Sequence, residues 1–266
     1  MLWKRVLTAV VGIPLFVSLL YEGRYLFLVG MVVLTTVLLS ELRQMLCRAD
    51  LVPPSLFFYG GGLAYLLISY FAPSGKEGEL LWIGLTLILL LHLLLFLVLF
   101  PKTDLAQLSA SFLGSCYVGL LLSFFILLRK SEPLGFQEAL LVLVATWAYD
   151  TGAYFAGCFC GRHFLLPHVS PNKTVEGVLG GLVSTCLVTL VFSAFFLPRS
   201  GIWAVVFGVL VGISVQLGDL VESALKRVSK VKDSGSLLPG HGGFFDRFDG
   251  FLWSCPTAYF FFKFFG

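Results

Sequence analysis

Two aspartates, Asp246 and Asp249, stand three residues apart near the end of the chain, in the segment HGGFFDRFDG. In a helix that starts near Phe244, this spacing points both carboxylates in the same direction. Paired carboxylates attract a cation, and a divalent cation can bridge them to phosphate oxygens. Three glycines precede the pair, Gly240, Gly242 and Gly243. Glycines allow unusual backbone angles and can expose backbone N–H groups to an anion. The segment therefore predicts a site where a metal ion meets phosphate.

Basic residues surround the same aspartates, namely Lys226, Arg227, Lys230, Lys232 and Arg247. In a phosphoryl-transfer site, these cations would hold the phosphate groups that the metal also contacts. The alternative is a solvated basic loop that is attracted to anionic lipid headgroups, with about 1 kcal/mol from each cation. That alternative accounts for the lysines but leaves the aspartates and glycines unexplained.

Asp219 begins a polar stripe at the end of an apolar run. Glu222, Ser223 and Lys226 follow it at the i+3, i+4 and i+7 positions, so a continuing helix places all four side chains on one face. Asp150 lies inside another apolar run, VATWAYDTGAYFAG, where an ionisable group is costly unless it is paired or hydrated. Asp150 therefore either faces a polar cavity or forms a buried ion pair or hydrogen bond that locks two helices together.

A second polar segment, GRHFLLPHVSPNKTVEG, covers residues 161–177. Lys173 can meet a phosphate as a point charge, and Ser170 or Thr174 can cap the helix that begins near Glu176. A possible zinc set lies here too, made of Cys158, Cys160, His163 and His168. Its Cys-x-Cys spacing differs from that of ordinary zinc loops, so a turn of small residues is the favoured interpretation. His92, alone in a Leu-rich run, is predicted to be a hydrogen-bonded packing residue.

The composition indicates that lipid surrounds most of the chain. Of the 266 residues, 58% are hydrophobic and 12% are charged, whereas a soluble domain carries about 25% charged residues. The mean hydropathy is +0.94. The six cysteines are scattered through or beside apolar runs and are interpreted as small hydrophobic residues, not as a disulfide framework.

These properties predict an all-α, polytopic membrane protein with about nine transmembrane helices. Backbone hydrogen bonds must close within each span in lipid, which requires helices, and the alternating pattern of a membrane β-barrel is missing. Lys4 and Arg5 precede the first run without a cleavage pattern behind it, so we expect a retained span and not a signal peptide. The predicted spans are 6–21, 25–40, 55–73, 80–100, 106–128, 137–157, 175–197, 202–221 and 248–265.

The distribution of Lys and Arg predicts the orientation. Twelve of the 18 lie on the side of the N-terminus and six on the other side, which places the N-terminus and the segment 222–247 in the cytoplasm and the C-terminus outside. Residues 1–145 have short loops and are predicted to be a hydrophobic scaffold. Residues 146–266 are predicted to be the catalytic region, with cytoplasmic polar loops at 158–174 and 222–247. Gly60–Gly62 and Gly180–Gly181 suit close helix packing.

The stretch from Ser223 to Asp249 resembles the signature of the phosphatidate cytidylyltransferases, also called CDP-diacylglycerol synthases. The positions that match are Ser223, Leu225, Lys226, Arg227, Lys232, Asp233, Gly235, Leu238, Pro239, His241, Gly242, Gly243, Asp246, Arg247 and Asp249. The segment SPNKTVEG and the segment around Asp150 also resemble that family. Residues 1–145 resemble it only as a hydrophobic scaffold.

The resemblance implies a Mg²⁺-dependent transfer of CMP from CTP to phosphatidate, which yields CDP-diacylglycerol and pyrophosphate. It also implies a homodimer with a polar cavity that opens to the cytoplasm. A short chain with a single module suits the bacterial inner (plasma) membrane, and no nucleic-acid partner is expected. The implied metal ligands are Asp219 and Asp246, with Asp249 as a third acid, and a second cation, monovalent or divalent, is compatible with them.

The expected catalytic residues are Lys173, Lys226, Arg227, Lys232 and Asp246, of which the four basic residues would hold the phosphates. Expected substrate contacts are Asp150, Asn172, Glu176, Ser223, Asp233, His241, Gly242, Gly243 and Arg247. The phosphate of phosphatidate is already an anion, so the reaction needs no strong general base.

Two other functions remain open from the residues alone. In an ion-coupled transporter, Asp150 and Asp219 would be acids of the transport pathway, and nucleotide would not be consumed. A CTP-dependent polyprenol or lipid kinase would move the γ-phosphoryl group and release CDP. Release of pyrophosphate or of CDP separates the two CTP-dependent reactions.

Overall fold

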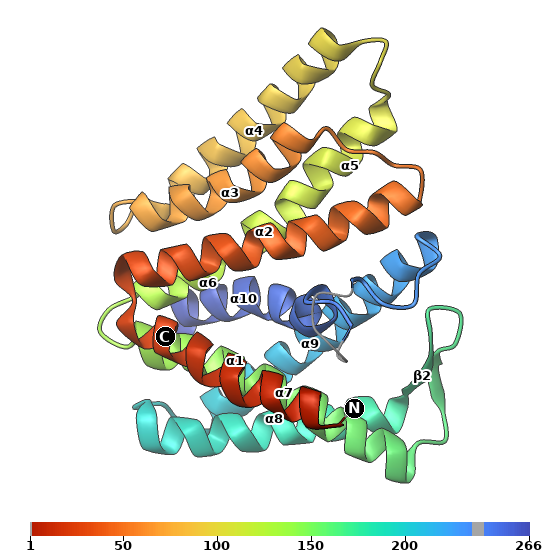
Figure 1. Ribbon diagram of the computed structural model, residues 1–266. Coiled ribbons are helices and arrows are strands. Elements are labelled where there is room, and N and C mark those ends of the chain that lie inside the picture. The colour runs from red at the N-terminus through yellow and green to blue at the C-terminus, as the bar shows by residue number, and fades with distance from the viewer. Residues whose placement is uncertain (1, 236–241) are drawn as a thin grey trace. The chain divides into compact units, whose positions relative to one another are not determined.

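The structure is a computed structural model that describes residues 2–235 and 242–266, with side chains from Val10 onward in the first of these ranges. Helices occupy every apolar run predicted as a span (Figure 1). They are α1 (Leu2–Glu22), α2 (Arg24–Arg48), α3 (Ser55–Phe71), α4 (Glu77–Leu99), α5 (Leu105–Ser115), α6 (Leu121–Lys130), α7 (Gly135–Cys160), α8 (Val175–Phe196), α9 (Gly201–Val228) and α10 (Phe245–Phe265). A π-helical turn, η1 (Cys116–Leu120), joins α5 to α6, so residues 105–130 form one continuous helical segment.

Six helical segments of the described residues are long and apolar enough to cross a membrane. They are Arg24–Arg48, Glu77–Leu99, Leu105–Lys130, Gly135–Cys160, Val175–Phe196 and Gly201–Val228. These segments confirm an all-α integral membrane protein. The count of nine spans stays a prediction, because the described apolar parts of α1 and α3, Val10–Glu22 and Ser55–Phe71, are shorter and α10 is not among the six.

Two helices extend further than the apolar runs predicted. α7 continues to Cys160 and α9 continues to Val228, where the sequence predicted loops from residues 158 and 222. Hydropathy marks where lipid contact ends, whereas helical hydrogen bonding continues wherever the side chains allow it. In α9, an ion pair between Glu222 and Lys226 at i,i+4 spacing supports the additional turns.

The second polar segment contains a feature that the sequence did not predict. Its residues form an antiparallel β-hairpin, in which β1 (Phe164–Leu166) pairs with β2 (Ser170–Thr174). Phe164 lies opposite Thr174, and Leu166 opposite Ser170. This hairpin is the only sheet within residues 2–235 and 242–266, and it leads directly into α8.

The chain divides into two compact units, Met1–Lys130 with Val228–Asp246, and Ser131–Arg227 with Arg247–Gly266. The predicted division at residue 145 separates a scaffold from a catalytic region and stays a prediction about function. In the first unit, α3 packs against α2, α4, α5 and α6 (Figure 1). A Cβ atom on Gly119 would lie 2.3 Å from the carbonyl oxygen of Gly62, so the backbones of α3 and η1 touch. This contact agrees with the predicted packing role at Gly62, whereas a Cβ atom on Gly60 would meet nothing within 4 Å.

His92 is a packing residue of the first unit, as predicted. Its side chain is 1% exposed. Nδ1 lies 2.8 Å from the carbonyl oxygen of Ile88, and Nε2 lies 3.1 Å from the hydroxyl of Ser111 on α5. Both ring nitrogens therefore have partners, and the rings of Phe57 and Phe112 lie edge-on to the imidazole.

Two adjacent cations cap helix ends in the first unit. Arg129 donates hydrogen bonds to the carbonyl oxygens of Leu20 and Tyr21 at the end of α1. Lys130 donates to three carbonyl oxygens at the end of α3, those of Ser69, Tyr70 and Ala72. Cations stabilise the negative ends of helices and satisfy carbonyl groups that lack a helical partner. Both residues were counted on the side opposite the N-terminus, and each of them has this local structural role.

In the second unit, α7 and α8 pack backbone to backbone. A Cβ atom on Gly152 would lie 2.7 Å from the carbonyl oxygen of Gly180, and one on Gly180 would lie 2.2 Å from the Cβ of Ala156. Hydrogen bonds then join α7 to α9 through Tyr149 and Gln216, and α9 to α10 through Ser214 and Thr257. Such bonds between helices fix their register where lipid offers no polar partner.

Candidate active site

Three carboxylates form an acidic cluster in the second unit, made of Asp219 and Glu222 on α9 and Asp249 on α10. One oxygen from each lies within 4.8 Å of the others. Glu222 is 1% exposed, and the other two acids are half-buried. Three negative charges this close repel one another strongly in a partly buried place, so the arrangement favours a bound cation or paired ammonium groups.

Two glycines bring the helices close enough to form this cluster. A Cβ atom on Gly218 would lie 2.4 Å from the backbone oxygen of Asp249, and one on Gly250 would lie 2.6 Å from Cγ1 of Val215. Each glycine directly adjoins an acid of the cluster, Gly218 before Asp219 and Gly250 after Asp249. The contact between α9 and α10 therefore sets the separation of the carboxylates.

Two lysines pair with the cluster. Lys173, from β2, forms an ion pair with Asp219, and Lys226 forms an ion pair with Glu222 one turn along α9. Their side chains are 19% and 18% exposed. The sequence predicted Lys173, Asp219, Lys226 and Asp249 as site residues, and the structure brings these four together.

Asp150 and Arg247 belong to the same neighbourhood. Asp150 is exposed on α7 and lies within electrostatic range of Asp219, Lys173 and Arg247. It also adds negative potential at Asp249. The sequence left two roles open for Asp150, a polar cavity or a buried ion pair between helices. These charged neighbours favour the polar cavity.

Glu222 was not predicted as a member of the cation site. Its spacing from Asp219 placed it on the polar stripe, but the resemblance assigned the metal to Asp219, Asp246 and Asp249. The signal that could have found it was the i, i+3 pair of acids at the end of an apolar helix.

The β-hairpin is anchored at both of its ends. Glu176, in the first turn of α8, accepts hydrogen bonds from the backbone N–H groups of Arg162 and His163 and lies 2.6 Å from Nδ1 of His163. Arg227 donates from Nε to the carbonyl oxygen of Val169 at 3.0 Å. Of the two predicted caps, Ser170 and Thr174, it is Thr174 that caps α8, by accepting from the N–H of Gly177.

These contacts hold Lys173 in place. Glu176 and Arg227 were predicted to act on substrate, and their described contacts are with the hairpin. Asn172 is exposed on β2 beside Lys173. Ser223 is buried and follows Glu222 on α9. His163, a member of the possible zinc set, is bonded to Glu176.

The first unit contains the remaining predicted residues, in the segment that leads into α10. Oδ2 of Asp246 accepts hydrogen bonds from the N–H and hydroxyl of Ser234 and from the N–H of Gly243, at 2.9–3.0 Å. Gly242 has φ of +80°, a conformation that favours glycine. Lys232 and Asp233 are exposed, and His241 lies outside the described residues. Asp246 therefore organises this segment, and its predicted metal role stays a prediction.

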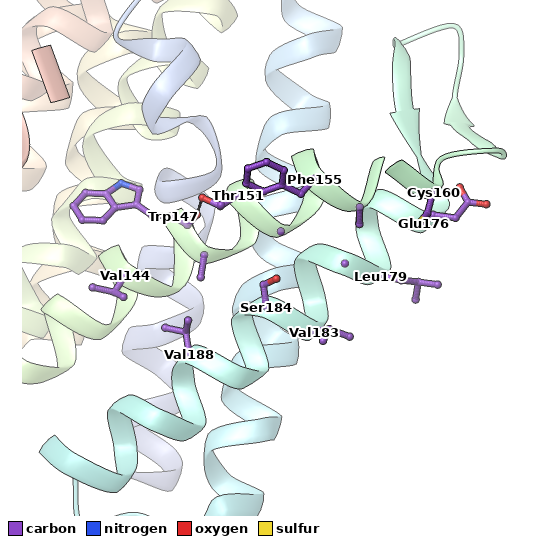
Figure 2. A pocket seen from close by; sticks show the side chains of 14 residues that line it. Val144, Trp147, Thr151, Phe155, Cys160, Glu176, Leu179, Val183, Ser184 and Val188 are labelled. Atoms are coloured by element: carbon purple, nitrogen blue, oxygen red, sulfur yellow. Dashed lines mark hydrogen bonds between the residues drawn. The ribbon is translucent and has the colours of Figure 1, made fainter. Parts of the chain in front are cut away.

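An apolar groove of about 860 Å³ runs along α7 and α8. Figure 2 shows Trp147, Phe155, Leu179 and Val183 along it, with Glu176 and Cys160 at one end. Lipid chains can cover such a surface in a membrane. The polar end of the groove adjoins the hairpin that carries Lys173.

Comparisons with known proteins cover nearly the whole chain. The model of the Cytidylyltransferase family matches residues 3–265. A phosphatidate cytidylyltransferase of Bacillus subtilis is 35% identical over 259 residues, which are 97% of this chain and 96% of that protein. Proteins of the same name from Staphylococcus epidermidis and Staphylococcus aureus are each 34% identical, and the alignments cover 95% of both chains.

Proposed function

Because the chain belongs to the cytidylyltransferase family, we propose that it transfers CMP from CTP to phosphatidate, giving CDP-diacylglycerol and pyrophosphate. The observation that carries the proposal is the acidic cluster with its two lysines, formed by residues of and around the signature segment. Relatives of nearly equal length are named for this activity.

The chemistry requires two polyanions to meet. A phosphate oxygen of phosphatidate attacks the α-phosphorus of CTP and forms a new P–O bond. The bond from the α-phosphorus to the oxygen that leads to the β-phosphorus breaks, and pyrophosphate leaves with the electron pair. The nucleophile is already ionised, so the protein has to position the reactants and to stabilise charge.

The residues of the cluster suit a magnesium ion. Asp219, Glu222 and Asp249 offer the hard oxygen ligands that Mg²⁺ prefers. One oxygen from each lies within 4.8 Å of the others, so these three residues would hold the ion. When bound, the ion would polarise phosphate oxygens and neutralise the charge that develops on pyrophosphate. A second cation, monovalent or divalent, would add to this neutralisation.

Lys173 and Lys226 have two partners available in this scheme. Without a metal they neutralise Asp219 and Glu222. With a cation held by those carboxylates, the two ammonium groups would be available to the phosphate oxygens of CTP. Arg227, Lys232 and Arg247 remain predicted phosphate contacts, and the other predicted substrate contacts are Asp150, Asn172, Glu176, Ser223, Asp233, His241, Gly242 and Gly243.

The excess of Lys and Arg on the N-terminal side supports a site that faces the cytoplasm. CTP is a cytoplasmic nucleotide, and a lipid headgroup lies at the membrane surface, so both substrates reach a site at that face. The bacterial relatives support the inner membrane as the location. The protein would act there as a homodimer.

The proposal is tested with the purified protein in mixed micelles of detergent and phosphatidate. With radiolabelled CTP and Mg²⁺, we expect labelled CDP-lipid and one pyrophosphate for each CDP-lipid formed, and a chelator should stop both. Release of CDP with a phosphorylated lipid would instead identify a CTP-dependent kinase. Substrate flux in sealed vesicles without nucleotide consumption would identify a transporter.

Replacing Lys173 by methionine is expected to lower kcat/KM by about ten- to a hundredfold, because one charge-assisted hydrogen bond to phosphate is lost. Methionine keeps most of the length of the unbranched side chain and removes the ammonium group with its charge and its hydrogen-bond donors. Steady-state rates at varied CTP measure the effect. The matched control is Lys102→Met, at an exposed lysine of the first unit, which should leave kcat/KM unchanged. Equal rates for both variants would remove Lys173 from the site.

A further inference from the structure

Glu41 is a fully buried acid to which the sequence assigned no role. It lies on α2, in the first unit, and its side chain is 0% exposed. A carboxylate in such a place is retained only when hydrogen-bond donors replace the lost water. The groups that donate hydrogen bonds to Glu41 therefore indicate what this carboxylate does in the fold.

The described partners of Glu41 all come from the segment that leads into α10, about two hundred residues further along the chain. The N–H of Phe244 donates to Oε1 at 3.1 Å, and the N–H of Phe245 donates to Oε2 at 2.8 Å. Oε2 also lies 3.1 Å from the hydroxyl of Ser234. Phe245 is the first residue of α10, so the carboxylate satisfies N–H groups that have no helical partner and places its charge at the positive end of the helix.

A second carboxylate completes the arrangement. The Ser234 hydroxyl lies 2.9 Å from Oδ2 of Asp246 as well as 3.1 Å from Oε2 of Glu41. Asp246 also accepts from the N–H groups of Ser234 and Gly243. Ser234 thus links the two acids, and both of them hold the same turn of backbone.

Two glycines make room for Glu41. A Cβ atom on Gly235 would lie 2.3 Å from Oε1 of Glu41, and one on Gly243 would lie 2.6 Å from Oε2 and 1.9 Å from the Ser234 hydroxyl. Both positions belong to the signature segment. Their lack of a side chain is therefore explained by the approach of this buried carboxylate, without any substrate.

We infer that Glu41 is a positioning residue for CMP transfer, an inference that rests on the proposed function. Its carboxylate caps the start of α10 and closes the base of the signature segment. Asp249 follows Phe245 by one turn of the same helix. Loss of this cap would loosen the first turn of α10, which is the turn that leads to Asp249.

The test compares Glu41→Gln with the wild-type chain in detergent. Glutamine has the same shape but removes the charge and turns one acceptor into a donor that faces a backbone N–H. We expect kcat for each folded molecule to fall about ten- to a hundredfold and the Mg²⁺ concentration for half-maximal rate to rise, with a KM for CTP within about threefold of wild type. Hydrogen exchange at the amides of Phe244 and Phe245 should become faster, while exchange in α4 stays the same.

The matched control is Glu138→Gln, at a buried acid of the second unit that also accepts from a serine hydroxyl. This variant should keep the wild-type kcat and Mg²⁺ dependence. Ser234→Ala is the second variant, since it removes one partner of Glu41 and leaves the carboxylate itself. Ser234→Ala should also lower kcat. In the double variant, kcat should fall by less than the product of the two single reductions.

Wild-type kcat, Mg²⁺ dependence and amide exchange in Glu41→Gln would overturn the inference. So would a variant in which only the melting temperature falls, because that result indicates a purely structural acid. If Glu41→Gln does not fold, an unchanged kcat in Ser234→Ala overturns it. If the wild-type chain makes no CDP-lipid, the proposed function fails, and the exchange rates at Phe244 and Phe245 still decide whether Glu41 caps α10.

Discussion

Replacing Asp249 by asparagine is expected to lower the rate of CMP transfer by about a thousandfold, because the site loses a ligand oxygen and a negative charge that hold the cation. Folding should be kept. The described hydrogen bond of Asp249 is between its Oδ1 and the N–H of Gly250, and asparagine retains an oxygen at that position. Radiolabelled CDP-lipid formation measures the rate, and the melting temperature in detergent measures folding.

The control is Glu79→Gln, at an exposed acid in the first turn of α4, which should keep the wild-type rate. A rate for Asp249→Asn within tenfold of wild type would remove Asp249 from the cation site. Comparing Glu222→Gln with Asp246→Asn then identifies the third ligand, since loss of a ligand raises the Mg²⁺ requirement. The acidic cluster predicts the larger rise for Glu222→Gln, whereas the sequence resemblance predicts it for Asp246→Asn.

The helices were predictable because lipid imposes a strong constraint on sequence. Every span must be apolar over most of its length and must close its own hydrogen bonds, so the nine apolar runs fall on helices. Helix ends were less predictable, as α9 shows. Its last turn carries Lys226 and Arg227 beyond the apolar run, and these cations favour the negative end of the helix.

The β-hairpin could not be predicted from its local pattern. Its five-residue strand, Ser170–Thr174, contains Pro171, Asn172 and Lys173, which are poor strand formers. Contacts from elsewhere hold it, through Glu176 on α8 and Arg227 on α9. Tertiary contacts therefore override a weak local preference at the place where Lys173 has to be held.

The candidate site was predictable as a set of charges but not as a geometry. Lys173 and Asp219 are 46 residues apart in the sequence, and only the fold shows that they pair. Glu41 was out of reach for a different reason. A single acid at the end of an apolar run has the appearance of an ordinary surface residue, and its burial depends on a loop far along the chain.

For the glycines of the signature segment too, the sequence gives the residue type but not the neighbours in the fold. The sequence interpretation placed Gly242 and Gly243 among the substrate contacts, with N–H groups open to an anion. The structure gives Gly243 a neighbour within the protein, the Glu41 carboxylate, and gives Gly242 a positive φ. A glycine in a motif thus indicates either a close contact or an unusual backbone angle. The sequence does not show which atom makes that close contact.

The last prediction concerns Gly218, where the contact of two helices determines the site. Replacing Gly218 by alanine puts a methyl group 2.4 Å from the backbone oxygen of Asp249 and 2.9 Å from the Cα of Gly250. Neither atom is the end of a flexible side chain, so α10 has to move away from α9. We expect a cost of about 1–3 kcal/mol in folding free energy. We also expect a loss of about a hundredfold in kcat, because a displacement of about 1 Å is enough to misplace a catalytic group.

The matched control is Gly60→Ala, at a helical glycine of α3 with nothing within 4 Å of the added Cβ. Alanine has the higher helix propensity, so this variant should be as stable as wild type or slightly more stable, with the wild-type kcat. Melting temperature and CDP-lipid formation are measured for both variants in the same detergent. If Gly218→Ala retains full activity, the spacing of α9 and α10 does not control the acidic cluster. If it loses activity while its melting temperature stays high, the close contact at Gly218 exists to place the carboxylates, since a contact that served only folding would lose both together.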